Sequence, residues 1–382
     1  MQRTIKDLII LAGLCVGSTL LVWLPFFLGA GQFWGIPLPD DGMAAVVRNF
    51  DGPYYLVVAK TLYQPELVKQ FEFDLPVEYY AAHYPFYPLL IRLLGLVLSF
   101  PYAMLTVTVI TAVGMVWMFY WLVKELKVGD PLWLSVVLLV LPARGLVVRS
   151  VGSPEPLFLL LVMGSVYGMV KKNYWLAGIC GAMAQLTKPP GALLFVAFGL
   201  YLASRELQRL NAGRLVTWMK GWPWKAYPLF LIPVSLVGLF WWYGQIYGDY
   251  MAYFNSGDNI HLFWPPFQMF NRAAVWVGTF WLEDMVWVLL LGAMGVVALW
   301  KRQDVISWFG LVFFSSTLFV AHRDLARYSL PLVPFLIIAF APWLEKKEFK
   351  WALVVLVIPI YLFAVNFIAG NTTPVSDWGK LL

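Results

Sequence analysis

The stretch Arg48-Asn49-Phe50-Asp51-Gly52-Pro53-Tyr54-Tyr55 lies on a polar loop, residues 30–84, between two apolar runs of the chain. This loop is rich in acidic residues and in tyrosines. A protein made mainly of lipid-facing helices has no structural need for so acidic and aromatic a loop. The sequence therefore predicts that something polar binds there.

The composition indicates an integral membrane protein. Hydrophobic residues make up 61% of the 382 residues, charged residues only 13%, and the mean hydropathy is +0.74. Soluble domains have nearer a quarter charged residues. The apolar stretches are continuous rather than alternating, which excludes a β-barrel. We predict an all-α polytopic membrane protein, a bundle of about 11–12 transmembrane or half-transmembrane helices with a structured first outer loop.

Several of the predicted helices are shorter than the ~20 residues that a perpendicular span needs. Such lengths predict half-helices, tilted helices, or helix ends that stop at a water-filled cavity. Pro85, Pro88 and Arg92 make the second apolar run the best candidate for a half-helix. The predicted helices are 7–29, 86–99, 102–123, 131–142, 154–170, 174–187, 190–204, 228–246, 285–300, 305–321, 329–344 and 351–368.

The basic residues indicate an orientation. Lys and Arg cluster at the N-terminus and in short loops, which the positive-inside rule places in the cytoplasm together with the N-terminus; about eleven crossings follow. This distribution also explains the net charge of +6 without nucleic acid as a partner. The whole chain, 1–382, is predicted to be one integral membrane domain. Its main loops are a first extracytoplasmic loop, 30–84, a basic cytoplasmic loop, 205–226, and a second extracytoplasmic loop, 247–284.

The acids of the first loop fall into three groups. Asp51 precedes Gly52-Pro53 and an apolar run, a pattern that suits either a helix N-cap or a catalytic carboxylate beside a cavity. Asp40 and Asp41 follow two prolines near the end of the first helix, at the membrane surface. The remaining acids are interpreted as solvated surface: Glu66, Glu72, Asp74 and Glu78.

A run of aromatic residues, Tyr79 to Pro88, ends the loop. Aromatic residues at a membrane interface are ordinary belt residues. The alternative is that they stack on sugar rings or on a polyprenyl chain. On the second interpretation, the aromatic and histidine candidates of this loop for binding a sugar or an acceptor are Tyr54, Tyr55, His83 and Tyr84.

Ionisable residues near apolar segments form a second set of candidates, because charges in such places are costly and often functional. A group of cations with few acids to pair suits an anionic phosphate. The alternatives are that they contact lipid headgroups, or that Arg327 pairs with Asp324. The candidates for phosphate are Arg323, Arg327, Lys188 and Arg144, and Glu155 and His322 join the candidates for sugar or acceptor.

Several motifs are absent. The sequence contains no Walker loop, no dinucleotide fingerprint, no HExxH and no G-x-S-x-G. No predicted cytoplasmic segment is long enough to bind a nucleotide sugar. An energy-rich donor must therefore come from the membrane or from the outer side.

Four short motifs, in the same order along the chain, resemble motifs of the PIG-V-like membrane glycosyltransferases of the GT-C superfamily. This family is named for a mannosyltransferase of GPI-anchor synthesis. The family's Trp-Asp pair with following aromatics corresponds to Phe50-Asp51 with Tyr54-Tyr55, where Phe replaces the Trp. Its Phe-Pro-x-x-Pro-type motif resembles residues 84–89. Its Ser-Glu-Ser-Leu-Phe-like motif resembles residues 153–158, and its Leu-Thr-Arg-Pro-x-Gly-like motif resembles residues 186–191, with Lys at position 188.

The resemblance implies an inverting transfer of a sugar, mannose by analogy, from a polyprenyl-phosphate donor to a lipid-linked or glycan acceptor hydroxyl on the extracytoplasmic face. Asp51 would be the general base, with Asp41 or Asp40 as the second choice, and the cations named above would hold the departing phosphate. The membrane would be a bacterial plasma membrane or the ER. A divalent cation such as Mg²⁺ or Mn²⁺ is compatible with the acidic loop, although no ligand spacing specifies one and no metal ligand is assigned.

The competing class is a transporter or flippase for an anionic lipid or a lipid-linked saccharide, which also needs charges and broken helices. No inverted internal repeat is visible in the sequence, and the charges gather near one surface rather than at the midplane. A non-catalytic scaffold would explain neither the acidic loop nor the outer arginines.

Overall fold

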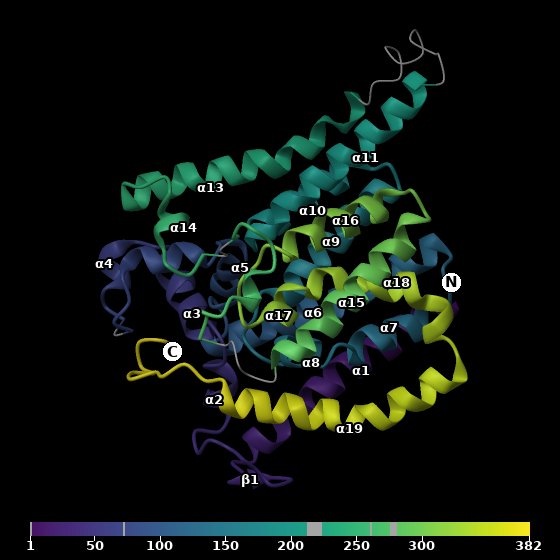
Figure 1. Ribbon diagram of the computed structural model, residues 1–382. Coiled ribbons are helices and arrows are strands. Elements are labelled where there is room, and N and C mark those ends of the chain that lie inside the picture. The colour runs from purple at the N-terminus through teal and green to yellow at the C-terminus, as the bar shows by residue number, and fades with distance from the viewer. Residues whose placement is uncertain (1, 72, 212–223, 260–261, 276–280) are drawn as a thin grey trace. The chain divides into compact units, whose positions relative to one another are not determined.

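The computed structural model describes residues 2–71, 73–211, 224–259, 262–275 and 281–382 (Figure 1). The chain divides into two compact units, which are described separately. Unit 1 consists of Met1–Leu160, Gly238–Asn259 and Ala341–Leu382, and unit 2 of Leu161–Val237 and Ile260–Phe340.

The structure confirms an all-helical membrane fold. Each of the twelve predicted apolar segments contains a helix, and the sheet content of the described residues is one two-stranded hairpin, β1 (Gln32–Phe33) and β2 (Ile36–Pro37). The long helices of the chain are α1 (Gln2–Phe27), α6 (Phe100–Leu126), α9 (Glu155–Val170), α11 (Ala192–Asn211), α13 (Leu231–Tyr247), α15 (Trp281–Trp300), α16 (Val305–Thr317) and α19 (Lys347–Gly370).

By length and composition, seven described helical segments can cross a membrane, or eight if one bent pair is a single span. The bent pair is α7 (Pro131–Val140) and α8 (Ala143–Ser150), whose axes differ by 77°. Pro142 separates them, as expected of a residue that cannot continue a helix. The sequence predicted one segment here and missed α8. The predicted eleven crossings would require several of the shorter helices to cross as well, and that number stays a prediction.

The first loop is structured, as predicted. It contains α2 (Met43–Val47), α3 (Gly52–Thr61), α4 (Pro65–Val68) and the 3₁₀ helix η1 (Val77–Ala82), and it leads into α5 (Phe86–Leu94). α3 packs against α5 and α6, and α5 packs against α6. These contacts hold the start of α3, where Asp51 lies, against the helical body of unit 1.

The core of unit 1 is built on α1, α6 and α7. Leu11 and Cys15 of α1 contact Ala112, Val116 and Tyr120 of α6 in one buried cluster. The Tyr120 hydroxyl also donates a hydrogen bond to the Asp7 carboxylate at 2.9 Å. α19 runs beside α8 (Figure 1). The short helix α14 (Ala252–Asn255), also in this unit, packs against η1.

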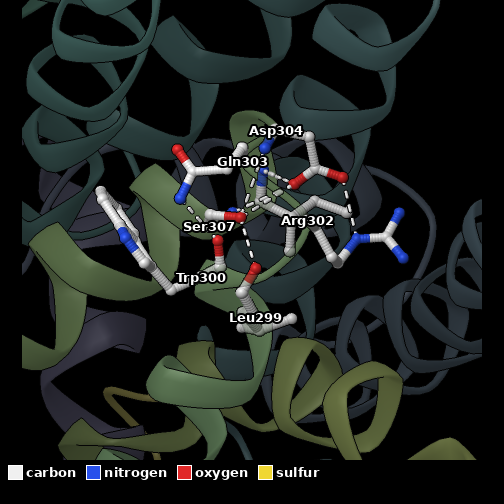
Figure 2. Close-up of polar contacts among 7 residues, drawn as sticks. Leu299, Trp300, Arg302, Gln303, Asp304 and Ser307 are labelled. Carbon is white, nitrogen blue, oxygen red and sulfur yellow. Dashed lines mark hydrogen bonds and ion pairs between the residues drawn. The ribbon is translucent and has the colours of Figure 1, made fainter.

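In unit 2, α16 packs against both α11 and α15, and η3 (Trp224–Phe230) packs against α10 (Tyr174–Gln185). Figure 2 shows the turn from α15 into α16. Asp304 caps α16 by accepting the Ile306 and Ser307 amides, and the Ser307 hydroxyl donates to the Leu299 carbonyl at 2.6 Å. The other short elements of the unit are η2 (Pro189–Gly191), η4 (Gln268–Phe270), α17 (Leu325–Tyr328) and η5 (Leu330–Leu332), which leads into α18 (Val333–Leu344).

The predicted cytoplasmic loop 205–226 lies largely outside the described residues, as do Glu72, His261 and part of the predicted loop 247–284.

Candidate functional site

Asp51 lies at the N-cap position of α3, but its side chain makes no capping hydrogen bond within the described first turn. The backbone reaches this position through a tight turn, because the Gly52 amide donates to the Asn49 carbonyl at 3.1 Å. A Cβ at position 52 would overlap the Val47 carbonyl oxygen. Asp51 therefore occupies the N-cap position without capping α3 through its side chain.

The structure brings Asp51 together with His83 and Asp258. One ligand atom of each of these residues lies within 4.8 Å of the others. His83 is 2% exposed and follows η1, whereas Asp258 is exposed and follows α14. The packing of α14 on η1 explains why His83 and Asp258, far apart in the sequence, meet.

Asp258 was not among the site residues predicted from the sequence. The signal that was present is weak: the residue lies in the predicted second extracytoplasmic loop, on the same predicted side as the acidic loop.

Tyrosine rings surround this cluster, which we call the Asp51–His83–Asp258 cluster. The ring centroids of Tyr54, Tyr55 and Tyr79 lie 5.6, 5.0 and 5.5 Å from that of His83. The Tyr79 hydroxyl is hydrogen-bonded to the Asp258 carboxylate. Tyr54, Tyr55 and His83 were predicted to bind sugar or acceptor, and the structure places all three around Asp51 and Asp258.

The phenols of the cluster stay protonated at neutral pH. Burial raises the pKa of Tyr54 above its usual range, and the Asp51 and Asp258 carboxylates raise it further. Burial also raises the pKa of Tyr79. The Asp258 carboxylate raises it further, and the Asp51 carboxylate adds a smaller effect. A negative charge on either ring would be opposed by the neighbouring carboxylates. Both hydroxyls therefore keep their protons, and that of Tyr79 is donated to the Asp258 carboxylate.

Two buried tyrosines fix the backbone that carries His83. The Tyr63 hydroxyl donates to the His83 carbonyl at 2.6 Å, and the Tyr243 hydroxyl donates to the Ala81 carbonyl at 2.9 Å. Tyr84, predicted to bind sugar or acceptor, is 1% exposed, and its ring centroid lies 5.4 Å from that of Tyr253 of α14. Tyr84 thus contributes packing that joins η1 to the segment leading to Asp258.

The two alternative acids of the first loop have other surroundings. Asp41 forms an ion pair with Arg48, with Oδ2 2.7 Å from Nε. Asp40 is exposed.

Glu155 is 4% exposed and accepts a hydrogen bond from the Ser153 hydroxyl. The neighbouring polar groups are Thr108 and Tyr87, whose hydroxyl oxygens are 2.7 Å apart. The Tyr87 ring centroid in turn lies 5.1 Å from that of Tyr55. The predicted ligand-binding Glu155 therefore belongs to a buried polar group that reaches the tyrosines of the cluster through Tyr87.

The two arginines of α8 lie in different surroundings. The Arg144 guanidinium carbon lies 3.9 Å from the Phe367 ring centroid and 5.9 Å from that of Phe50. Arg149 is 3% exposed, and its guanidinium donates to the carbonyls of Cys15 and Leu139 and to the hydroxyls of Ser18 and Thr19. Arg149 therefore ties α8 to α1 and α7. Arg144 stacks against α19 beside the residue that precedes Asp51.

In unit 2, three predicted residues meet around Tyr328. The Lys188 Nζ and the Arg327 guanidinium carbon lie 6.0 and 5.5 Å from the Tyr328 ring centroid, and the His322 ring centroid lies 5.0 Å away. Arg327 also pairs with Asp324 at 3.2 Å, the alternative that the sequence left open. Arg323 is exposed. Tyr328, which joins these groups, was not among the predicted site residues.

No protein-family model and no curated protein matches the sequence. Two solved structures are similar in fold. One is the archaeal oligosaccharyltransferase AglB from Archaeoglobus fulgidus in complex with an inhibitory peptide and a dolichol-phosphate, with 13% identity, 98% of this chain and 57% of that chain covered, and a TM-score of 0.49. The other is the Archaeoglobus fulgidus oligosaccharyltransferase tethered to an acceptor peptide containing the NVT sequon, with 12% identity, 98% and 56% coverage, and a TM-score of 0.52.

The chain spans somewhat more than half the length of these structures. At 12–13% sequence identity the similarity concerns the fold alone, and it rests on the second structure, whose TM-score is 0.52. The narrower resemblance to PIG-V-like enzymes stays a prediction from the sequence. The chain shares the fold of this oligosaccharyltransferase structure over 98% of its own length.

Proposed function

We propose that the protein is a membrane glycosyltransferase that moves a sugar, mannose by resemblance, from a polyprenyl-phosphate donor to a hydroxyl of a lipid-linked or glycan acceptor. The observation that carries this proposal is the Asp51–His83–Asp258 cluster at the start of α3, in which tyrosine rings lie against His83. The GT-C fold and the resemblance around Asp51 support it.

The reaction would be a single displacement with inversion. The acceptor oxygen forms a bond to the anomeric carbon while the bond from that carbon to the phosphate oxygen breaks. The phosphate leaves with the electron pair, and Asp51 takes the acceptor proton as general base. One carboxylate is sufficient for this step, in contrast to the pair that glycosidases use. The neutral Tyr54 hydroxyl would donate to a hydroxyl or ring oxygen of the sugar. The Tyr79 hydroxyl, whose proton goes to Asp258, would accept a hydrogen bond from a sugar hydroxyl.

The Asp51–His83–Asp258 cluster also fits a divalent cation. Two carboxylates and one imidazole within 4.8 Å form a mixed oxygen and nitrogen donor set, which suits Mn²⁺ or Zn²⁺ better than Mg²⁺, because Mg²⁺ prefers oxygen ligands. We propose that these three residues would hold the ion. A bound cation would supply positive charge that stabilises anionic oxygens at the site.

Chelation is therefore expected to remove sugar transfer, and Mn²⁺ is expected to restore it. Asp258→Asn should weaken Mn²⁺ binding by about tenfold or more, because even the loss of a residue that only supports a metal ligand typically lowers the affinity by about that factor. The check is Mn²⁺ titration of the detergent-solubilised protein by electron paramagnetic resonance, alongside activity.

Asp74→Asn is the matched control for this experiment. Asp74 is exposed and has a φ of 52°, a conformation that asparagine adopts readily. Unchanged Mn²⁺ affinity in Asp258→Asn, or an equal loss in Asp74→Asn, would argue against the cation site.

Lys188, His322 and Arg327 around Tyr328, the Tyr328 group of unit 2, include two cations of the kind that bind phosphate. We propose that Lys188 and Arg327 bind the donor phosphate, with Arg323, Arg144 and His322 as the further candidates from the sequence. Lys188→Met should raise the KM for the donor about tenfold, since a charge-assisted hydrogen bond contributes ~1.5–3 kcal/mol, and should change the KM for the acceptor little. Steady-state kinetics with each substrate varied in turn measures both values.

Lys69→Met is the matched control, because the Lys69 ammonium pairs with Glu66 on an exposed surface at 3.2 Å. Equal donor KM values in wild type and Lys188→Met would remove Lys188 from the phosphate site.

The experiment that tests the proposed function is transfer of radiolabelled mannose from a polyprenyl-phosphate donor to membrane-extracted acceptors in detergent. Transfer supports the enzyme, and we propose that it acts on the extracytoplasmic face of a bacterial plasma membrane or the lumenal face of the ER. Two results together would favour the transporter or flippase. The protein would transfer neither mannose nor several other sugars, and it would move a labelled lipid-linked saccharide across the membrane of proteoliposomes.

A further inference from the structure

The segment that follows α19 pairs with the loop that carries Asp51. Thr372 and Asn49 form an antiparallel bridge. The Phe50 amide donates to the Asn371 carbonyl at 3.4 Å, and the Thr373 amide donates to the Arg48 carbonyl at 2.7 Å. Figure 1 shows this segment in yellow next to α2 and α3. The backbone just before Asp51 is thus held by residues more than three hundred positions away in the sequence.

Side chains strengthen the same contact. Asn49 is fully buried, and its amide donates to the carbonyl of Ile368, in the last turn of α19, at 2.8 Å. The Asn371 amide donates to the Asn49 side-chain oxygen at 3.3 Å. The Phe50 and Phe367 ring centroids are 5.3 Å apart. The loop is therefore attached to α19 itself as well as to the segment after it.

Thr373 makes the contact that reaches the site. Its hydroxyl donates to the Phe50 carbonyl at 2.7 Å, and the same side chain lies close enough to the Tyr54 hydroxyl to lower the pKa of that group. Phe50 has a φ of 48°, a left-handed conformation that costs energy in a residue with a side chain. Thr373 therefore joins the strained residue before Asp51 to a tyrosine of the cluster.

We propose that residues 371–373 brace the Asp51 loop and that Thr373 is a positioning residue for Tyr54 and Asp51, an inference that rests on the proposed function. Thr373 has no role in bond making or breaking. It holds Phe50 and Tyr54 in one arrangement, which lowers the cost of bringing the Asp51 carboxylate to an acceptor hydroxyl.

The test is Thr373→Val, which keeps the shape of the side chain and removes the hydroxyl. It should lower kcat about tenfold, as expected for the loss of a hydrogen bond at a partly buried polar group, and leave the KM for the donor unchanged. Thr373→Ser restores the hydroxyl and should restore kcat. Thr372→Val is the matched control, because among the described residues the Thr372 hydroxyl makes no hydrogen bond.

Hydrogen–deuterium exchange of peptides that cover residues 47–54 gives a readout that does not depend on activity. Thr373→Val should exchange faster there than wild type and Thr372→Val, at an unchanged Tm. Unchanged exchange and kcat in Thr373→Val, or an equal loss in Thr372→Val, would overturn the brace. If wild type transfers no sugar while the exchange difference is present, the proposed function fails and the brace is supported.

Discussion

Asp51→Asn is expected to lower sugar transfer by ~10²–10⁴-fold, the contribution of a general base. The substitution keeps the size of the side chain and removes the charge that would accept the acceptor proton. Asparagine has the shape of aspartate and can still form hydrogen bonds, so we expect the fold and the Tm to be kept. Thermal unfolding in detergent and the initial rate of transfer, measured on the same preparation, check both statements.

Asp40→Asn is the matched control and also tests the second choice from the sequence. Asp40 lies in the same loop and is exposed, so wild-type activity is expected. Full activity of Asp51→Asn would move the base to Asp40 or Asp41. Measurement at saturating Mn²⁺ separates two roles: recovery there would mean that Asp51 only holds a cation, whereas a persistent loss supports proton transfer.

Gly52→Ala is expected to reduce both stability and activity. A Cβ at this position would overlap the Val47 carbonyl oxygen and approach the Met104 methyl carbon to 3.3 Å. The first of these neighbours is backbone and cannot turn aside, so the turn before α3 must open. Overpacking of this kind costs ~1–3 kcal/mol, and the displaced backbone carries Asp51. We expect a lower Tm and a loss of transfer comparable to that of Asp51→Asn.

Gly31→Ala is the control, because it lies in the same loop and a Cβ there meets nothing within 4 Å. It should have the Tm and the activity of wild type. A Gly52→Ala protein with wild-type stability and transfer would show that the turn is looser than its contacts indicate, and would weaken the case for a preorganised Asp51.

The sequence determined that this is a membrane protein of many helices with a structured acidic loop, because hydrophobic run length and charge distribution act locally and need no knowledge of packing. It also singled out Asp51, His83 and Tyr54, since polar and aromatic residues in such a loop have no structural need to be there. It did not determine whether Asp51 caps α3 with its side chain, because the N-cap pattern is the same in both cases.

Only the tertiary structure brought Asp258 to Asp51 and His83, through the packing of α14 on η1. Only the tertiary structure gathered Lys188, Arg327 and His322 around Tyr328, and placed Thr373 against Phe50. These contacts join residues far apart in the chain. They depend on which helix faces pack together, and in a bundle with apolar residues on most faces the pattern of one sequence leaves that choice open.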